Sequence, residues 1–343
     1  MNNPVIEVET APTSEVSLDD KYRKERGYAY MSGSHALIRV MINQRIRDND
    51  AGLNTAGFVS GYRGSPLAGF DTALWSAEAV LKQHQIKFLP AINEDLAATA
   101  VWGTQQLALF PQESTVDGVF SMWYGKGPGV DRSGDALKHG NGAGTSALGG
   151  VLVAAADDHT AKSSTFGHQS EQALIAAFIP VLYPASVQDY LDFGVLGIAM
   201  GRYSGLWVGL KCVSDVIETS AVADVDPHRI DIRLPNKEFA ADEDLHIRSP
   251  DVWAEQEPRI VRKRLPAALA FCRANRLNSI RIKGPKSKLG IVCAGKAYND
   301  VMEALRLLGL SDDDGEKWPG CAQNRHGVAS GADDSPRLRG RPR

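Results

Sequence analysis

The chain has 343 residues, enough for two domains, and its 43% hydrophobic and 23% charged residues are ordinary for a globular protein. The net charge of -3 gives no indication of a nucleic-acid partner or of an anionic membrane surface as a binding site. No apolar run reaches the length of a membrane span, and the polar first 20 residues contain no secretory signal. We therefore expect a cytoplasmic protein.

The cysteines give no evidence of a metal framework. The four of them are far apart in the sequence and show no C-x-x-C spacing: Cys212, Cys272, Cys293 and Cys321. Iron–sulfur clusters and structural zinc sites need several thiolates brought together, usually through such short spacings. We expect reduced, buried thiols and no metal ligands among the residues of this chain.

The pattern of apolar residues predicts an α/β fold. Residues 1–24 form a polar lead-in, and residues 25–236 alternate between strands and helices, which favours a doubly wound parallel sheet. The expected strands of this part are Thr55–Ser60, Phe88–Ile92, Asp117–Trp123, Val151–Ala156, Ile179–Tyr183 and Leu206–Val213. The expected helices are one capped by Ser32 or Ser34 and running to about Arg47, one from Pro66, one from Glu94 to about Phe110, and one from Val187 to about Tyr203.

The remaining sequence changes character twice. Residues 237–285 are charged and helical, as in a linker, and residues 286–314 look like the incomplete start of a second α/β domain, with strand Leu289–Gly295 and helix Tyr298–Leu308. Residues 315–343 are rich in Gly, Arg, Pro and Asp and have no periodicity or strand signal. We expect this tail to lack stable packing, either as a natural disordered tail or, by preference, as the product of a frameshift.

Two stretches about thirty residues apart carry the functional signal. Gly61-Tyr62-Arg63-Gly64-Ser65-Pro66 follows a predicted strand and forms a glycine turn, and Glu94 follows the next predicted strand at the start of a helix. The carboxyl ends of parallel strands meet at one edge of a sheet, where ligands bind. This pair resembles the pyrimidine-binding domain of 2-oxoacid:ferredoxin oxidoreductases, in particular the indolepyruvate type, over about residues 28–235.

The resemblance implies that thiamine diphosphate binds through Gly64, Ser65, Pro66 and Glu94. Glu94 would be catalytic, because a carboxylate in this place hydrogen-bonds the aminopyrimidine and so promotes loss of the thiazolium proton. Ser65 and His168 are candidates for contacting the 2-oxo acid. Arg63 and Ser65 depart from the G-Y-P-G-T-P form of the turn, which affects contacts on the substrate side.

The resemblance also implies a larger assembly. Magnesium and iron–sulfur clusters are expected only in parts of the enzyme beyond this chain, and the complete enzyme would use ferredoxin, coenzyme A and a 2-oxo acid. A homo-oligomer is expected, with no nucleic-acid or membrane partner. We expect this chain by itself to be inactive as an oxidoreductase.

Each local signal has a simpler interpretation. Glu94 could be an ordinary first-turn glutamate favoured by the helix dipole, and the turn at Gly64 a plain strand–helix connection with Ser65 as the N-cap. His168 and His159, with Asp157 and Asp158, are better explained as a solvated loop than as a metal site. Gly142–Ala147 matches a dinucleotide fingerprint but precedes a strand instead of following one.

Two other functions remain open at this point. The chain could belong to a different thiamine diphosphate enzyme, such as a decarboxylase or a transketolase relative. It could also be a non-catalytic fragment that only supports a partner subunit. Gly134-Asp135-Ala136 begins like the magnesium motif of thiamine enzymes but lacks the asparagine that should follow about thirty residues later.

Overall fold

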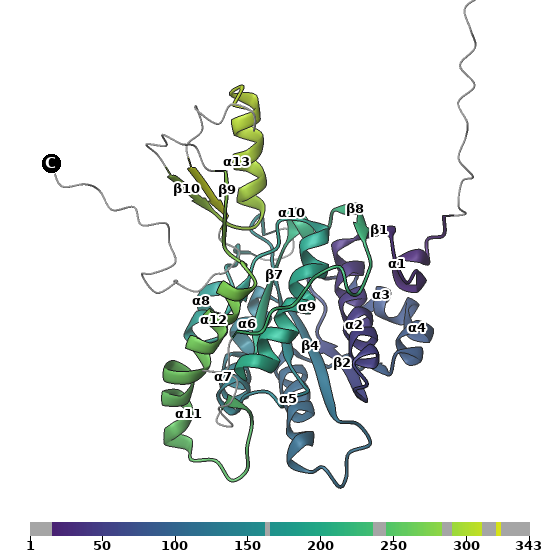
Figure 1. The fold of residues 1–343 in the computed structure, drawn as a ribbon, viewed down its shortest axis with the longest axis vertical. Helices are drawn as coiled ribbons and strands as arrows, with labels where there is room; N and C mark the ends of the chain where they lie inside the picture. Colours follow the sequence, from purple (N-terminus) through teal and green to yellow (C-terminus); the bar gives the residue numbers. More distant parts are fainter. Residues whose placement is uncertain (1–15, 162–164, 236–244, 283–289, 311–319, 324–343) are drawn as a thin grey trace, which may run out of the picture.

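A six-stranded parallel sheet forms the centre of the protein (Figure 1). The computed structural model describes residues 16–161, 165–235, 245–282, 290–310 and 320–323. The strands lie in the order β3-β2-β4-β5-β7-β6 and all neighbours are parallel. Their bounds are β2 Thr55–Gly61, β3 Ile86–Phe88, β4 Gly118–Lys126, β5 Val151–Asp157, β6 Val181–Leu182 and β7 Val208–Val213.

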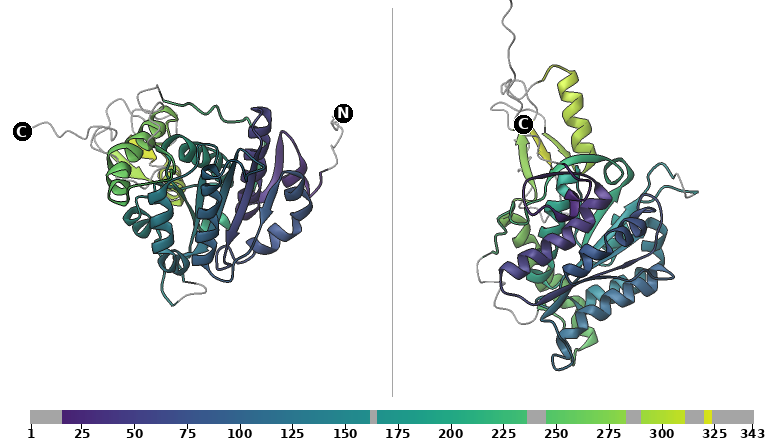
Figure 2. Two further views of the ribbon diagram at one scale, coloured as in Figure 1. Left: turned by 90° about the horizontal axis from the view of Figure 1, so that it is seen from below. Right: turned by 90° about the vertical axis from the view of Figure 1, so that its right-hand side faces the viewer.

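Helices cover both faces of this sheet (Figures 1 and 2). Side chains alternate between two apolar clusters, so that in β4 Met122 and Tyr124 enter one cluster and Trp123 the other. The first cluster lies under α2 Gly33–Asp50, α3 Phe70–Ser76, α4 Glu78–Gln83 and α9 Val187–Ser204. The second lies under α5 Glu94–Gln105, α6 Gly127–Arg132, α7 Gly134–Ala143 and α8 Glu171–Ala176. The predicted doubly wound parallel sheet is confirmed.

Helix α2 begins where the sequence predicted. Ser32 is its N-cap, and the Ser32 hydroxyl accepts a hydrogen bond from the backbone N–H of His35 at 3.3 Å. The helix continues to Asp50, three residues beyond the expected end at Arg47. The expected helices from Glu94 and from Val187 are also present, and a single 3₁₀ turn, Gln106–Leu109, extends the first of them.

Two predicted boundaries on the carboxyl side of the sheet are wrong. The helix expected from Pro66 begins at Phe70, because a turn closed by the Leu67 N–H donating to Gly64 O at 2.7 Å comes first. Ser65 is therefore not an N-cap; Gly69 takes that position. The strand expected at Phe88–Ile92 is Ile86–Phe88, since Pro90 has no N–H to continue a regular ladder.

A small antiparallel pair at the side of the molecule was not predicted. Strand β1, Tyr28–Ser32, pairs with β8, Ser220–Asp224, which follows the short helix α10, Ser214–Ile217. Helix α1, Asp20–Arg23, lies within the expected lead-in and buries Tyr22. Residues 1–15 lie outside the described part of the chain.

The segment expected to be a linker packs on the main body. It contains α11 Trp253–Arg259, a π-helical stretch Ile260–Arg264 and α12 Leu265–Ala274. The Arg264 side chain is 0% exposed and donates to the carbonyl oxygens of Leu245, Asn141, Gly142 and Ala143 at 2.7–3.1 Å. A guanidinium thus binds the carboxyl end of α7, where helix carbonyls lack partners and carry partial negative charge.

Two glycines before β5 allow close packing within the protein. Gly140 lies in α7, where an added Cβ would come within 2.4 Å of the Trp207 ring. Gly144 has φ +98, and its added Cβ would lie 2.5 Å from the Arg264 guanidinium.

A second, smaller unit follows. Strands β9 Ser279–Ile282, β10 Gly290–Cys293 and β11 Gly320–Gln323 form a sheet in the order β10-β11-β9, next to α13 Lys296–Leu307 (Figure 1). The turn at Gly295 contacts the Tyr183 ring, and Asn299 Nδ2 donates to Ala185 O at 2.6 Å.

Strand β11 corrects one expectation about the tail. We expected no strand after α13, yet residues 320–323 pair with β10 in parallel and with β9 in antiparallel orientation. The prediction for the rest of residues 315–343 lies outside the described residues. Across the described ranges, no helix has the length and apolar character needed to cross a membrane.

We expect Arg264→Ala to lower the free energy of unfolding by roughly 3 kcal/mol, because it leaves buried carbonyl oxygens without donors. Arg262→Ala is the matched control: Arg262 is exposed two residues away, so its loss should change stability by less than about 0.5 kcal/mol. Urea unfolding of both variants measures the difference. Equal stability of the two would show that the Arg264 contacts contribute nothing.

Candidate functional site

The strand order creates a crevice between β2 and β4. The chain leaves β2 toward β3 on one side of the sheet, and it leaves β4 toward β5 on the other side. At such a topological switch point the two outgoing loops diverge and leave room for a ligand at the carboxyl ends of the strands. The predicted turn Gly61–Pro66 follows β2, and the glycine-rich segment from Lys126 follows β4.

Three glycines let separate segments meet at this crevice. An added Cβ at Gly64 would lie 2.9 Å from Lys126 Cβ, and one at Gly127 would lie 2.3 Å from His168 Cβ. An added Cβ at Gly129 would lie 2.6 Å from both Cγ and Oε1 of Glu94. The first turn of α6 therefore separates Glu94 from His168, and both side chains rest against its backbone.

Hydrogen bonds to the backbone fix the start of α5, where Glu94 is the first residue. Asn93 caps α5, its side chain accepting from Leu96 N at 2.9 Å, and the Trp123 indole N–H donates to Glu94 O at 3.0 Å. The carboxylate is half-buried, and within the described ranges no hydrogen bond or ion pair joins it to another protein group. It is thus an oriented acceptor at the positive end of a helix.

His168 has one occupied and one open ring nitrogen. Its Nε2 lies 3.3 Å from Asp131 Oδ2, and Asp131 is an exposed residue of α6. Its Nδ1 is buried and has no hydrogen-bond partner among the described residues. A buried polar atom without a partner is costly, which makes this nitrogen a position where a bound molecule could supply the missing hydrogen bond.

The structure brings most of the predicted residues together. Gly64, Glu94 and His168 all contact the Lys126–Gly129 segment. Pro66 is buried beneath the turn, and Ser65 is half-buried with no side-chain hydrogen bond in the described part of the chain. Lys126 and Asp131 also lie at this site, and only their spatial neighbours identify them.

The β5 and β7 end of the same sheet edge is chemically different. Asp157 is buried and accepts from the N–H and the hydroxyl of Ser170, and Lys211, 3% exposed, forms ion pairs with Asp157 at 3.3 Å and with Glu171. Burial, and then the charges of Glu171 and Asp157, raise the pKa of Tyr183 to about 12. The Asp157 carboxylate is thus engaged by other protein groups.

No group of three or more metal-ligating side chains occurs among the described residues.

Exposed apolar side chains flank Glu94. Ile92 is 82% exposed, and Leu89 and Leu96 are about half exposed. All three lie on the segment that leads from β3 into α5. Three apolar side chains are thus accessible near the start of the helix that carries Glu94.

Two curated proteins are similar to this chain in sequence. Indolepyruvate oxidoreductase subunit IorA of Methanothermobacter thermautotrophicus is 24% identical over 288 residues, which are 84% of this chain and 42% of that protein. The subunit IorA of Methanothermobacter marburgensis is 24% identical over 302 residues, 86% of this chain and 43% of that protein. The chain therefore spans less than half the length of these relatives. No family model matches it.

A solved structure shares the fold. The 2-oxoglutarate:ferredoxin oxidoreductase from Magnetococcus marinus, with 2-oxoglutarate, coenzyme A and succinyl-CoA bound, superimposes with a TM-score of 0.60 over 87% of this chain and 54% of that chain. The two are 15% identical.

The chain is related to the N-terminal part of 2-oxoacid:ferredoxin oxidoreductases. The resemblance inferred from the turn and Glu94 is thereby confirmed at the level of the family.

We expect Gly129→Ala to displace the Glu94 carboxylate while the protein stays folded, because the added methyl group meets a flexible side chain and not a backbone atom. The carboxyl ¹³C resonance of Glu94 should shift, and the thermal midpoint should change little. Gly103→Ala, in the same helix as Glu94 and with nothing within 4 Å of the added Cβ, is the control. An unchanged Glu94 resonance in Gly129→Ala would refute the contact.

Proposed function

We propose that this chain is the pyrimidine-binding part of a thiamine-diphosphate-dependent indolepyruvate:ferredoxin oxidoreductase. The observation that carries the proposal is the Glu94 carboxylate, which lies at a helix start beside the switch point of the sheet and has no protein partner in the described ranges. The sequence similarity to the two IorA subunits supports indolepyruvate, an aryl 2-oxo acid, as the substrate class.

The residues present fit the aminopyrimidine end of the cofactor. Glu94 offers a carboxylate that no protein group in the described ranges engages, and glycine at positions 64, 127 and 129 lets the segments around it approach one another closely. Thiamine diphosphate, when bound, supplies a carbon nucleophile that adds to the 2-oxo group and stabilises the charge left by decarboxylation.

Glu94 has a defined task in this arrangement. In the proposed site its carboxylate would accept a hydrogen bond from the ring nitrogen of a bound pyrimidine and would stabilise positive charge there. The Asn93 cap and the Trp123 indole fix the helix start, so the carboxylate would need little reorganisation to do this. Gly64, Ser65 and Pro66 would also contact the pyrimidine.

His168 would contact the 2-oxo acid. Asp131 orients the imidazole through Nε2 and leaves Nδ1 directed away from that pair. An imidazole held in this way can donate to, or accept from, the carboxylate or oxo oxygen of a substrate. The remaining chemistry, including coenzyme A acylation and electron transfer to ferredoxin, would belong to other parts of the complete enzyme.

We expect Glu94→Gln in the complete enzyme to lower turnover by about 10²-fold or more, the scale of general acid–base assistance. The amide keeps the shape of the side chain but cannot balance charge on the pyrimidine. Glu113→Gln, a change of the same kind on an exposed loop, is the control and should retain full turnover. Reduction of a viologen dye with indolepyruvate measures both; near-normal turnover of Glu94→Gln would exclude Glu94 from the mechanism.

We expect His168→Gln to raise the KM for indolepyruvate by about tenfold with a smaller change in kcat, because a contact to the bound substrate is lost. The Kd for thiamine diphosphate should stay within about twofold. His139→Gln, on the exposed face of α7, is the control. A lower thermal midpoint with an unchanged KM would show that His168 is only structural.

A further inference from the structure

A second cavity lies on another side of the molecule, between α1, α2, the end of α4 and the segment after β8. Its volume is about 350 Å³, within the range of small-molecule sites. Asp50, which ends α2, and His84, which precedes β3, both line it. These residues lie toward the amino ends of the parallel strands, whereas the candidate site lies at the carboxyl ends.

The lining of this cavity is cationic although the chain as a whole is acidic. Four positively charged side chains line it, against the two carboxylates of Glu25 and Asp50: Arg23, Lys24, Arg26 and Arg39. Asp50 is engaged, since its Oδ2 lies 2.7 Å from His228 Nε2. The cavity therefore presents an excess of positive charge to whatever enters it.

The buried side chain of Arg39 forms the floor of the cavity. Its side chain is 1% exposed, and it donates to Asn43 Oδ1, Tyr22 O and Val225 O at 2.7, 2.9 and 3.0 Å. All three acceptors are neutral, and they use three of the five N–H groups of a guanidinium. Burial lowers the pKa of Arg39 to about 10, and the nearby charge of Asp226 opposes this effect. The hydrogen bonds of this buried cation thus go to neutral groups, and the nearby Asp226 carboxylate offsets only part of its charge.

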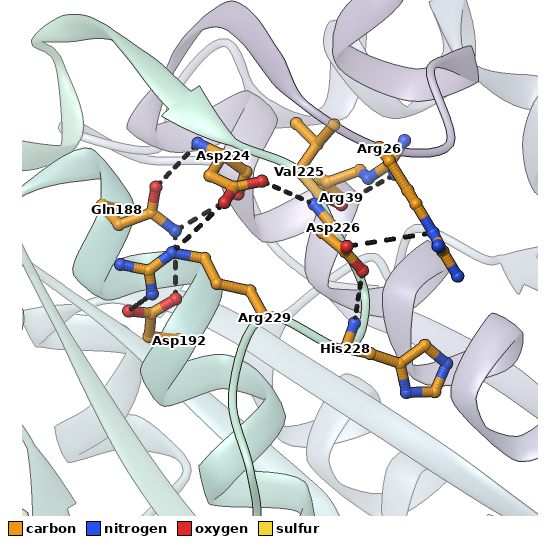
Figure 3. A network of polar contacts seen from close by, with 9 residues as sticks. All are labelled: Arg26, Arg39, Gln188, Asp192, Asp224, Val225, Asp226, His228 and Arg229. Carbon is orange, nitrogen blue, oxygen red and sulfur yellow. Dashed lines mark hydrogen bonds and ion pairs between the residues drawn. The ribbon is translucent and has the colours of Figure 1, made fainter.

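Two exposed arginines at the rim, Arg23 and Arg26, add positive charge to the cavity. Arg26 is 76% exposed, and its nearest carboxylate, Asp226, lies at 3.8 Å, too far for a hydrogen bond (Figure 3). Arg23 is exposed and lies 3.8 Å from Asp19. The pKa of His84 is lowered, first by burial and then by the charges of Arg39 and Arg45. Both rim arginines can therefore turn toward a ligand at little cost.

We propose that this cavity binds the phosphate group of a small anionic ligand. Several guanidinium groups around one space suit a phosphate, which accepts hydrogen bonds from them on three oxygens and carries more charge than a carboxylate. The proposal is independent of the thiamine site, because none of the residues that line the cavity contributes to that site.

The test is calorimetric titration of the purified chain with inorganic phosphate, pyrophosphate and ADP in low salt. We expect saturable binding by the wild type and at least tenfold weaker binding by the Arg23→Glu/Arg26→Glu double variant. Both positions are exposed, so the variant should keep its thermal midpoint. Lys138→Glu, an exposed charge reversal on α7, is the control and should bind as the wild type does.

The three probes separate two sources of the phosphate. ADP binding much tighter than phosphate supports a ligand that carries its phosphate on an organic body, and equal binding supports free phosphate. A second readout is the His84 ring titration by NMR, whose pKa should rise when phosphate is added because a bound anion favours the imidazolium. No saturable binding by the wild type, or equal weakening by Lys138→Glu, would overturn the proposal.

Discussion

Glycine at positions 127 and 129, in the first turn of α6, is the constraint on which the candidate site depends. The backbone from Lys126 to Gly129 runs between the turn at Gly64, the ring of His168 and the carboxylate of Glu94. Added Cβ atoms at Gly127 and Gly129 would come to 2.3 Å and 2.6 Å of their neighbours, closer than such atoms approach in proteins. Glycine at these positions lets residues from β3, β4 and the loop after β5 converge at the switch point of the sheet.

The polar side chains along the carboxyl edge of the sheet are of two kinds. Some are paired with other protein groups, and others have no protein partner in the described ranges. At β5 and β7, Lys211 is buried between two carboxylates, and removing it would leave them uncompensated at a cost of about 3–5 kcal/mol. At β2 and β4, by contrast, the Glu94 carboxylate and the Nδ1 atom of His168 have no partner in the described ranges. A protein tolerates such unsatisfied groups mainly where a ligand completes them, which is why this half of the edge is the better functional candidate.

The parts of the fold that could be predicted are those with strong local patterns. The alternation of apolar strands and amphipathic helices identified the parallel sheet, and the Ser32 cap located the start of α2. Boundaries failed where the geometry of a turn decides them, as at Phe70, which a turn at Gly64–Leu67 precedes. Strands β1 and β8 pair with each other although their paired residues are 188 or more positions apart in the sequence. The local sequence of either strand therefore does not predict it.

Contacts between side chains and distant segments also limited how much of the candidate site could be predicted from the sequence. Gly64 and Glu94 could be chosen because each follows a strand, but the contact between Glu94 and Gly129 depends on how α5 and α6 pack. Glycines elsewhere in the chain serve packing within the protein, since Gly140 and Gly144 accommodate Trp207 and Arg264. Glycine density alone therefore does not distinguish close packing from ligand approach.

The exposure of Glu94 determines what else the site requires. A single hydrogen bond open to water contributes about 0.5–1.5 kcal/mol, whereas micromolar binding needs about 8 kcal/mol. In the proposed site, Glu94 and the turn at Gly64 would orient a pyrimidine but could not hold it alone. Ile92, Leu89 and Leu96 provide the apolar surface on which a covering element can seat, and such a cover would exclude water and strengthen the Glu94 hydrogen bond in a medium of lower dielectric constant. In the proposed function, binding and catalysis at this carboxylate would thus depend on assembly of the complete enzyme.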